Sequence, residues 1–436
     1  MNTGRRRALA RLSVLTGLWG LAVAGCTDVR AHRALARHTG GSRPRVVVVG
    51  GGYGGGTAAR YVAVWGRGTI DVTLVEREPS FVSTPLSNLV VAGGLGIADI
   101  TVDYAGLAKL GVRVVRDSAV AVDTARRRVR LARGSDLRWD RLILSPGIGF
   151  LFDRIEGLDS AEARATFLHA WQAGPQTQAL HRQLEAMRDG GVFAISIPVA
   201  PLRCPPAPYE RACLAAWYLK RTKPRSKVLI LDGNADVQSE KELFEKAWNG
   251  RYKGIVEYRH DCVLTGVDLR TRTAHFEIAD DVTADVLNVI PPHGAATIAH
   301  EAGVVTANGR WCEVDFATFE SVRVPGIHVL GDAIQIAPAM PKSGHMANQH
   351  GKAAAAAILS LLAETPPEPL PVLTNTCYTF FDDREAAHVC SVHRYDATRR
   401  SYIPVPGAGG VASGWSEEEG RYGIAWAHAI WRDMLS

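Results

Sequence analysis

The sequence has no hydrophobic run of the length that spans a membrane. No segment of its 436 residues reaches the ~18 uninterrupted apolar residues that a spanning helix needs. A Cys-x-x-Cys-His motif is also absent, as is any cluster of cysteine and histidine with zinc-site spacing. We therefore expect this chain to have no transmembrane helix, no c-type haem of its own and no metal site.

Outside the N-terminal segment, positive and negative charges nearly balance. The chain has a net charge of +6, and four arginines before residue 26 supply +4 of it: Arg5, Arg6, Arg7 and Arg11. No acidic residue offsets them there, so the remainder carries only +2. A nearly neutral protein lacks the basic surface on which nucleic-acid binding depends, and DNA or RNA is not an expected partner.

Residues 1–26 have the pattern of an export signal. A basic run over residues 5–7 precedes an apolar stretch over 12–24, as in secretory signals. The adjacent arginines favour the twin-arginine route, which exports proteins already folded around a cofactor. Residues 23–26 resemble a lipoprotein cleavage site with Cys26 as the acylated residue, and an ordinary cut near residue 24 is the alternative. We expect a periplasmic protein, tethered to the membrane if Cys26 carries a lipid.

The spacing of the remaining cysteines specifies no disulfide. In an oxidising compartment disulfides persist, but six cysteines allow many pairings. Cys213 falls on a predicted helix over residues 212–220, where we expect a buried apolar side chain. The other five are Cys204, Cys262, Cys312, Cys377 and Cys390.

Glycine is abundant near residue 50. Residues 45–49, Arg-Val-Val-Val-Val, predict a buried parallel strand, and a G-x-G-x-x-G motif follows at Gly50, Gly52 and Gly55 before a helix-compatible stretch over 57–64. In such motifs the first glycine permits a tight turn, the second lets the backbone approach a pyrophosphate, and the third lets helix and strand pack closely. The helix N-terminus then favours the phosphates.

An acidic residue completes this pattern. A second apolar strand is predicted over 71–75, and it ends in Glu76, where a carboxylate can accept hydrogen bonds from ribose hydroxyls. The order of strand, glycines, helix, strand and acid predicts a bound dinucleotide rather than a glycine-rich loop without a ligand.

Two further segments favour FAD over NAD. Residues 142–147 form an apolar strand that ends in Ser-Pro-Gly at Gly147, as in flavoproteins with two dinucleotide-binding domains. Residues 324–333 resemble the second FAD motif of those proteins. In that motif the aspartate, here Asp332 after Gly331, bonds the ribityl chain and the phosphate.

The helix after this motif is predicted over residues 343–362 and would point its positive N-terminus at the flavin. Lys342, directly before its start, completes the expected FAD-binding residues. Prolines then end the helix and mark a linker from residue 366.

The sequence lacks a second phosphate-binding loop. Strands suited to a second Rossmann unit are predicted at 192–197 and 227–231, but residues 198–210 hold five prolines where its glycine-rich loop would belong. Prolines remove N–H donors and stiffen the chain, so we expect no nicotinamide cofactor. Cys204 lies on this rigid turn with Glu210 six residues on, which suits thiol–disulfide chemistry; a structural disulfide or a buried thiol is the alternative.

Several runs together resemble the flavoprotein subunit of flavocytochrome c sulfide dehydrogenase, and the likeness extends from about residue 44 to the C-terminus. The matching runs are Cys-Pro-Pro-Ala-Pro-Tyr-Glu-Arg-Ala at 204–212, Met-Pro-Lys-Ser-Gly-His-Met-Ala-Asn-Gln at 340–349, Asn-Thr-Cys-Tyr at 375–378, and the stretch around Trp426, Ile430, Asp433 and Met434.

The resemblance implies roles for matching residues. Cys204 and Cys377 would form a redox-active disulfide beside the flavin ring, and Glu210 would act there as an acid or base. Hydrosulfide would attack this disulfide and leave a persulfide, and the freed thiolate would pass two electrons to FAD. Electrons would then leave singly to a separate c-type cytochrome subunit.

The implied fold is α/β, with two dinucleotide-binding domains as in glutathione reductase and a C-terminal α+β interface domain. We expect a discontinuous FAD-binding domain over 44–164 and 296–365, and a second Rossmann-like domain without a nucleotide loop over 165–295. Residues 366–436 would cover the flavin and form the cytochrome interface, with strands at 378–381 and 388–393 and a surface loop at 407–414.

One position departs from the family pattern. Members with covalent FAD have a cysteine in the segment before Leu-Ser-Asn, and here Thr84 stands at that place. A threonine hydroxyl cannot form the thioether to the ring, so we expect non-covalent FAD with a somewhat lower potential.

Two other functions compete with this one. An exported sulfide:quinone oxidoreductase shares the fold and the disulfide chemistry, and residues 422–435 could form an amphipathic membrane-facing helix, although that spacing also suits packing on the core. A flavin-containing assembly subunit without turnover is disfavoured because Cys204, Cys377 and Glu210 are all present. His293, His300 and His345 are further candidates to line the site.

Overall fold

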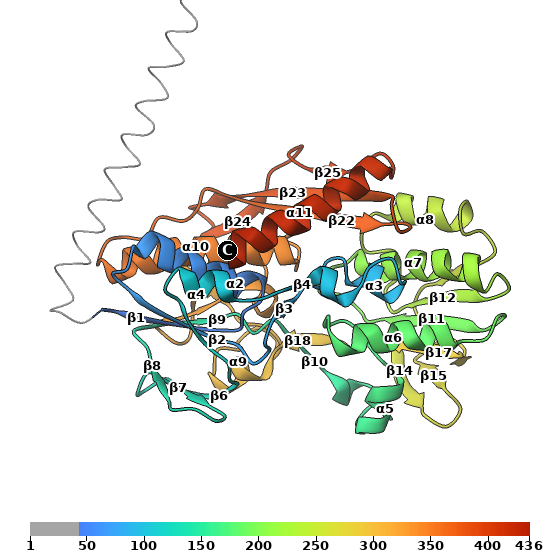
Figure 1. Ribbon diagram of the computed structural model, residues 1–436, viewed down its shortest axis with the longest axis horizontal. Coiled ribbons are helices and arrows are strands. Elements are labelled where there is room, and N and C mark those ends of the chain that lie inside the picture. The colour runs from blue at the N-terminus through green and yellow to red at the C-terminus, as the bar shows by residue number, and fades with distance from the viewer. Residues whose placement is uncertain (1–42) are drawn as a thin grey trace, which may run out of the picture.

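The computed structural model describes residues 43–436, so the predicted export signal and Cys26 lie outside the described residues. Figure 1 shows two sheet-containing bodies side by side, with β1, β2 and β9 at the left and β11, β12 and β17 at the right. The C-terminal strands and helix α11 (Glu417–Leu435) extend along the top of both. The predicted α/β class is confirmed.

The first body is built on a seven-stranded sheet in which five consecutive strands, ending at one edge, are parallel. Parallel strands are covered on both faces, and this explains the continuous apolar runs seen in the sequence. The strand order is β19 (Val314–Asp315), β20 (Glu320–Ser321), β21 (Ile327–Val329), β9 (Arg141–Leu144), β1 (Arg45–Val49), β2 (Asp71–Val75) and β5 (Arg113–Val115).

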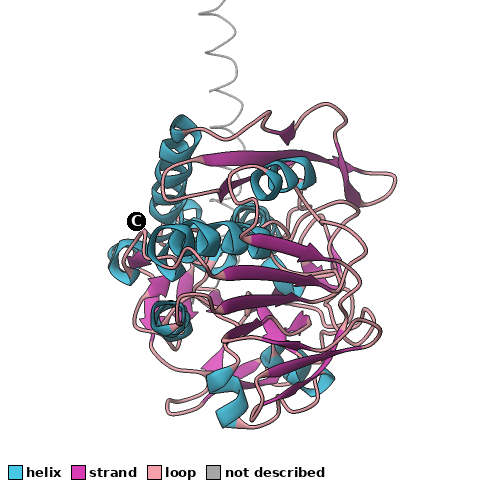
Figure 2. Ribbon diagram, turned by 90° about the vertical axis from the view of Figure 1, so that its right-hand side faces the viewer, coloured by secondary structure: helices cyan, strands magenta, loops and turns pink. Residues whose placement is uncertain are grey.

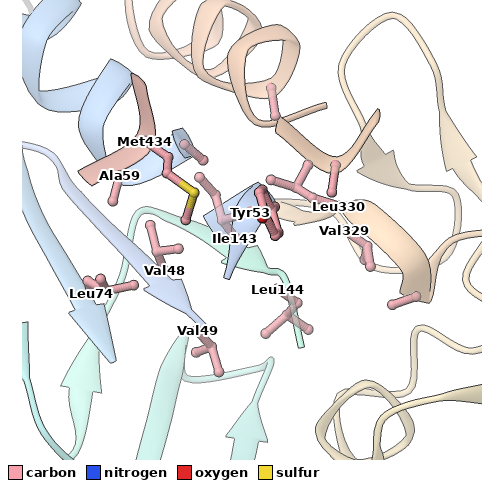
Figure 3. Close-up of a cluster of buried hydrophobic side chains, with 14 of the residues drawn as sticks. Val48, Val49, Tyr53, Ala59, Leu74, Ile143, Leu144, Val329, Leu330 and Met434 are labelled. Carbon is pink, nitrogen blue, oxygen red and sulfur yellow. The ribbon is translucent and has the colours of Figure 1, made fainter. Parts of the chain in front are cut away.

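Two helices cross this sheet at the expected FAD site. Helix α2 (Tyr53–Gly66) follows β1, and α10 (Gly344–Leu362) begins directly after the N-cap Ser343, close to the predicted start. Figure 3 shows how Val48, Ile143 and Val329 of three neighbouring strands pack in one cluster that also receives Met434 from α11.

Short elements complete this body around the sheet. They are β3 (Phe81–Val82) paired with β4 (Thr101–Val102), α3 (Ser87–Val91), α4 (Ala105–Lys109), the sheet of β6 (Ala119–Asp123), β7 (Arg128–Leu131) and β8 (Leu137–Arg138), and α9 (Thr297–Glu301).

The second body is a four-stranded parallel sheet in the order β13 (Val256–Arg259), β12 (Lys227–Asp232), β11 (Val192–Ile197) and β17 (Val286–Val289). The two strands predicted for it are confirmed as β11 and β12. Figure 2, viewed from this side, shows these strands stacked beneath the long C-terminal strands. The accompanying elements are α5 (Ala161–Thr166), α6 (Pro175–Ala186), α7 (Ala207–Thr222), α8 (Lys241–Asn249), β14 (Leu264–Asp268), β15 (Thr273–Phe276) and β16 (Val282–Thr283).

The predicted helix over 212–220 is longer than expected. It begins at Ala207, with Pro206 as its N-cap, so the prolines before it open a helix as well as stiffening a turn. Proline is tolerated in the first helical turn because those N–H groups have no intrahelical partner. Glu210 is therefore a first-turn residue of α7. Cys213 is fully buried, as expected.

Two antiparallel strands connect the bodies, and a third region covers them. The connecting pair is β10 (Ile148–Phe150) with β18 (His293–Ala295). The covering sheet consists of β22 (Val372–Phe380), β23 (Ala386–Asp396), β24 (Ser401–Pro404) and β25 (Gly410–Val411).

The prediction of a surface loop over residues 407–414 is wrong in part, because Gly410 and Val411 form the short strand β25, which pairs with Cys390 and Val389. That pairing satisfies backbone groups that β24 leaves free farther along β23.

The amphipathic stretch near the C-terminus packs on the core. Helix α11 contacts α2, β22 and β23, and its apolar residues Ile430, Trp431, Met434 and Leu435 are buried. Across residues 43–436, no helix has both the length and the apolar composition needed to cross a membrane. The same part of the chain contains no group of histidine, cysteine and acidic residues arranged to hold a metal ion.

Candidate active site

The first glycine loop has the backbone geometry of a phosphate cradle. Gly50 has a φ of +96°, and a Cβ there would lie 2.3 Å from the carbonyl oxygen of Ser145. A Cβ on Gly55 would lie 1.8 Å from the carbonyl oxygen of Gly50, whereas one on Gly52 would meet nothing within 4 Å. Helix α2 has no side-chain cap and no acidic residue in its first turn. The positive end of the helix and the open space above Gly52 thus fit an anionic ligand.

Glu76 lies against this loop. One of its carboxylate oxygens accepts a hydrogen bond from the backbone N–H of Gly51 at 2.6 Å, and the other accepts one from Glu78 at 2.9 Å. The carboxylate therefore holds the loop in place. Its role toward a ribose stays a prediction.

The second motif presents buried polar atoms without partners. Asp332 follows β21, and its Oδ1 is buried without a hydrogen bond. Two nitrogens of the Arg203 guanidinium, from the second body, are also buried without a hydrogen bond. Burial raises the pKa of Asp332, and the positive charges of Arg203 and Lys342 oppose that rise. Unpaired buried donors and acceptors are costly, so this gap fits the hydroxyl and phosphate groups of FAD.

The other expected cofactor residues surround the same place. Lys342 is 3% exposed, and its Nζ donates to the backbone oxygens of Asp332 at 2.9 Å and Ile334 at 2.6 Å. Lys342 thus anchors the loop after the second motif. Gly147 and Gly331 follow β9 and β21 with φ values of +69° and +68°.

Cys204 and Cys377 both lie beside the start of α10, although they belong to different parts of the chain. The N–H of Cys204 donates to the carbonyl oxygen of Lys342 at 2.8 Å. The Sγ of Cys377 lies 3.6 Å from the Nδ2 of Asn375, whose Oδ1 accepts from the hydroxyl of Ser343. The fold therefore brings together the two cysteines that the sequence singled out.

Both residues are free thiols in this structure, and the disulfide implied by the resemblance is not formed. Burial raises the pKa of Cys204 well above its usual value, and the neighbouring Cys377 raises it further. Burial raises the pKa of Cys377 to about 12. Since the thiolate is the reactive form, an unpaired thiol at either position would be unreactive at neutral pH.

Glu210 lies in the same environment and is 8% exposed. It accepts hydrogen bonds from the Nδ2 of Asn88 at 2.6 Å and from the backbone N–H of Phe380 at 2.9 Å. Burial raises its pKa to about 7, against the lowering effect of these two bonds and of Arg211. Its negative charge raises the pKa of both Cys204 and Cys377. A carboxyl group with this pKa can both give and take a proton near neutral pH.

A buried network holds Glu210 in position. The Oδ1 of Asn88 accepts from the Nε of Arg211 at 2.9 Å, and Arg211 also donates to Asn288 and to the backbone of His169 and Ala170. Arg211 is only 1% exposed. The network joins α3, α7 and β17, so the position of Glu210 depends on elements of both bodies.

Two of the three candidate histidines support the cysteines through the backbone. The Nδ1 of His293 accepts from the N–H of Arg203, and the Nδ1 of His345 accepts from the N–H of Thr376; each donor directly precedes one of the cysteines. Burial lowers the pKa of His345 to about 4, so its imidazole is neutral. His300 lies on α9 and makes no contact of this kind.

The second body has no free acid where a nicotinamide-binding domain would place one. Asp232 ends β12 and is fully buried. It accepts from the hydroxyl of Tyr209 at 2.6 Å, from the hydroxyl of Tyr258 at 3.2 Å and from the amide of Asn234 at 2.8 Å. This carboxylate is fully engaged within the protein, which agrees with the proline-rich loop before it.

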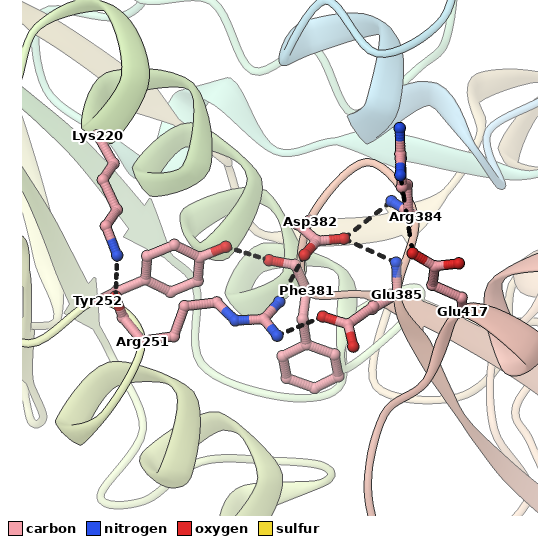
Figure 4. Close-up of polar contacts among 8 residues, drawn as sticks. All are labelled: Lys220, Arg251, Tyr252, Phe381, Asp382, Arg384, Glu385 and Glu417. Atoms are coloured by element: carbon pink, nitrogen blue, oxygen red, sulfur yellow. Dashed lines mark hydrogen bonds and ion pairs between the residues drawn. The ribbon is translucent and has the colours of Figure 1, made fainter.

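Arg251 fixes the cysteine-bearing strand to the second body. Its guanidinium pairs with Asp382 at 2.6 Å and with Glu385, both in the turn between β22 and β23. The hydroxyl of Tyr252 donates to the backbone oxygen of Phe381 in the same turn. Figure 4 shows these contacts side by side. They tie the end of the strand that carries Cys377 to the body that carries Cys204.

Three features of the site were not predicted from the sequence. They are the contact of Asn88 with Glu210, the unpaired guanidinium of Arg203, and a second buried carboxyl at Glu240. Asn88 and Arg203 are neighbours of residues that the motifs marked. Glu240 lies in a polar stretch with no motif, and the sequence contains no signal that would have found it.

Comparison with known families covers most of the chain. Residues 177–291 match the family described as the central part of the sulfide dehydrogenase [flavocytochrome c] flavoprotein chain. Residues 369–435 match the flavin-binding family of flavocytochrome c sulphide dehydrogenase, and residues 44–185 match pyridine nucleotide-disulphide oxidoreductase.

Individual proteins agree with these matches. A sulfide dehydrogenase [flavocytochrome c] flavoprotein chain of Chlorobaculum thiosulfatiphilum is 52% identical over 46 residues, which are 11% of this chain and 94% of that sequence. The mitochondrial sulfide:quinone oxidoreductase of Dictyostelium discoideum is 24% identical over 299 residues, 66% of this chain and 65% of that protein. The match thus spans slightly less than two thirds of the latter's length.

A solved structure shows the same fold. The sulfide:quinone oxidoreductase of Aquifex aeolicus superimposes with a TM-score of 0.74 at 19% identity, covering 90% of this chain and 91% of that chain. The predicted arrangement of two dinucleotide-binding domains is confirmed by this likeness.

Proposed function

The chain belongs to the family of flavoprotein chains of flavocytochrome c sulfide dehydrogenase, and from that membership we propose that it oxidises sulfide with FAD and passes the electrons to a c-type cytochrome subunit. The observation that carries this proposal is the meeting of Cys204, Cys377 and Glu210 beside the start of α10, next to a dinucleotide cradle. No other place in the described residues joins two cysteines with a titratable acid in this way.

The chemistry begins with Cys204 and Cys377 joined as a disulfide. The carboxylate of Glu210 takes a proton from hydrogen sulfide, and the resulting hydrosulfide attacks one sulfur of the pair. A new S–S bond forms as a persulfide while the Cys204–Cys377 bond breaks, and the second cysteine leaves as a thiolate. Burial raises the pKa of both thiols, so this thiolate is strongly basic and nucleophilic. It would bond the outer sulfur of the persulfide, which loses its proton, as the electron pair passes to the bound cofactor.

Several residues of this chain would hold the cofactor. Gly52 leaves room for the pyrophosphate, and Gly50 and Gly55 let the loop pack closely enough to form that space. Asp332 and Arg203 offer unpaired polar atoms to the rest of the cofactor. When bound there, FAD supplies an acceptor for the electron pair of the thiolate and releases electrons one at a time. We propose that it is held without a covalent bond, because Thr84 offers a hydroxyl where a thioether needs a sulfur.

A quinone acceptor is the second candidate, because sulfide:quinone oxidoreductases align over much of the chain. A quinone enzyme needs an apolar surface beside the flavin that enters a membrane. The apolar face of α11, which could have served, is buried against the core. We therefore favour a cytochrome, and we place the protein in the periplasm on the basis of the predicted signal over residues 1–26.

One experiment separates the two acceptors. The FAD-loaded protein is reduced anaerobically with one equivalent of sulfide, freed of excess sulfide, and then mixed with either cytochrome c or a water-soluble quinone. The proposal predicts rapid reoxidation of the flavin by cytochrome c and slow reoxidation by quinone. The reverse order would assign the chain to the quinone-reducing enzymes.

A further inference from the structure

A second buried carboxyl group lies beside the cysteine pair. Glu240 is 6% exposed; its Oε2 accepts from the hydroxyl of Thr379 at 2.8 Å, and its Oε1 is buried without a partner. An ionised carboxylate in this position would have an unsatisfied oxygen, which is costly. Burial and then the charge of Glu210 raise the pKa of Glu240 to about 8, so the group is mostly protonated at neutral pH.

The strand that carries Cys377 also carries the contact to Glu240. Thr379 lies two residues after Cys377 on β22, and side chains two apart on a strand point to the same side. Directly after Thr379 along the backbone, Phe380 donates its N–H to Glu210. The charges of Glu240 and Glu210 both raise the pKa of Cys377. The thiol and the hydroxyl thus lie on the same side of β22, and both carboxyl groups are close enough to act electrostatically on the thiol.

Glu240 also borders the outside. It lines a pocket of about 400 Å³ between the start of α8 and residues 411–413. Its backbone has a φ of +53°, a conformation unfavourable for a residue with a side chain, and its carbonyl oxygen accepts from Leu243 and Phe244 at the start of the helix. The fold thus fixes Glu240 between this pocket and the cysteine pair.

The oxidation of one hydrogen sulfide to the level of sulfur releases two electrons and two protons, and Glu210 can hold only one proton at a time. We propose that Glu240 is a second proton-transfer residue of the sulfide site, which passes protons released at Cys377 through the Thr379 hydroxyl to water in the outer pocket. This role rests on the proposed sulfide oxidation. In each turnover one proton reaches Glu210 from hydrogen sulfide and would follow the electron pair to the bound cofactor, while the second leaves the persulfide and exits through Thr379 and Glu240.

The charged groups around Glu240 are consistent with this route. Lys241 is engaged with Asp236 at 2.7 Å, and the ammonium of Lys246 lies 5.1 Å from the ring centre of Trp415. The groups around Glu240 are therefore Glu210 from α7, Thr379 and Cys377 from β22, and these two lysines and Glu242 from α8.

The test compares wild type, E240Q and E245Q as full-length FAD-loaded proteins. Glu245 is an exposed residue of the same helix, outside the pocket lining. Flavin reduction by sulfide is followed anaerobically from pH 5.5 to 9.5, with a pH-indicator dye recording proton release. E240Q is expected to slow both signals at least ~10-fold and to remove an ionisation near pH 8 from the rate profile, whereas E245Q matches wild type.

A second variant guards against a merely structural effect. E240G suits the left-handed backbone, and the space it opens admits formate. Formate is expected to restore at least half of the lost rate in E240G and none in E240Q. Wild-type rates and pH profile in E240Q, or no rescue of E240G, would overturn the role of Glu240 while leaving sulfide oxidation intact. If sulfide fails to reduce wild type itself, the proposed function fails and this role fails with it.

Discussion

Glu210 sets the pH response of the site at the scale of single residues. Its pKa of about 7 means that the carboxylate, which takes the proton of hydrogen sulfide, predominates only above neutral pH. The rate of flavin reduction by sulfide should therefore rise with pH through 7. In E210Q this rise should disappear and the rate at pH 7.5 should fall by roughly 10²-fold or more. E162Q, on the surface of α5, is the matched control, and an unchanged profile in E210Q would exclude the assigned role.

The raised pKa of Glu240 predicts how the stability of the protein changes with pH. Its pKa is about 8 in the folded protein and near the ordinary value of 4.5 when unfolded, so the folded state binds the proton more tightly. The stabilisation this provides is full below pH 4.5 and is lost as pH rises through 8. The melting temperature of E240Q should therefore depend less on pH. Relative to wild type, the melting temperature of the variant should rise between pH 5 and pH 9. A constant difference in melting temperature across that range would contradict the raised pKa.

Sequence reasoning succeeded for residues that carry a local pattern and missed those that depend on the fold. Cys204 and Glu210 belong to one run of sequence, so both were predicted. Asn88 contacts Glu210 across 122 positions of the chain, and Thr379 contacts Glu240 across 139. No spacing rule connects residues that far apart, since tertiary packing alone brings them together.

At the scale of elements, the turn between β22 and β23 positions one half of the cysteine pair. Arg251 and its partners Asp382 and Glu385 are all at least 73% buried, so their hydrogen-bonded pairs are worth more than exposed ion pairs. R251A should lower the free energy of unfolding by about 1–3 kcal/mol and speed amide exchange in residues 377–386. R259A, in an exposed pair with Glu257, should do neither. If amide exchange in residues 377–386 were equally fast in R251A and R259A, the ion pairs of Arg251 would not be what holds this turn.

Strands β1, β2, β11 and β12 were predicted because their apolar runs of five or six residues are bounded by clear turn residues. The start of α7 was misjudged because its prolines were interpreted only as a rigid turn. The short strand β25 was missed because glycine-rich sequence signals a loop, and only the free edge of β23 gives it a partner.

At the scale of the whole molecule, we expect the lack of a nicotinamide site to separate this chain from reductases of the same fold. The second body keeps the parallel sheet but has a proline-rich loop and an engaged Asp232 where a nucleotide would bind. NADH and NADPH should leave the flavin oxidised for many minutes under anaerobic conditions. Rapid bleaching by either would require a nucleotide site that these residues do not provide.

The state of the cofactor is a property of the whole molecule as well. Because Thr84 stands where we expect the linking cysteine of covalent family members, acid precipitation should release yellow FAD into the supernatant and leave a colourless pellet. The T84C variant makes the opposite test at the same position, because it supplies the sulfur that a thioether needs. A yellow pellet from the wild type would mean that another residue holds the flavin covalently.

The order of domains along the chain followed from the two FAD motifs, which enclose the second body in sequence. Their meeting at a single site did not follow from the sequence, because α10 and the C-terminal strands must fold back across both bodies to place Cys377 beside Cys204.

The passage of electrons from sulfide through these two sulfurs is the central claim, and anaerobic stopped-flow mixing with sulfide tests it most directly. Wild type should lose its flavin absorbance with one equivalent of sulfide, while C204S and C377S bind FAD normally and stay oxidised. Flavin reduction by sulfide at wild-type rate in either variant would contradict the account.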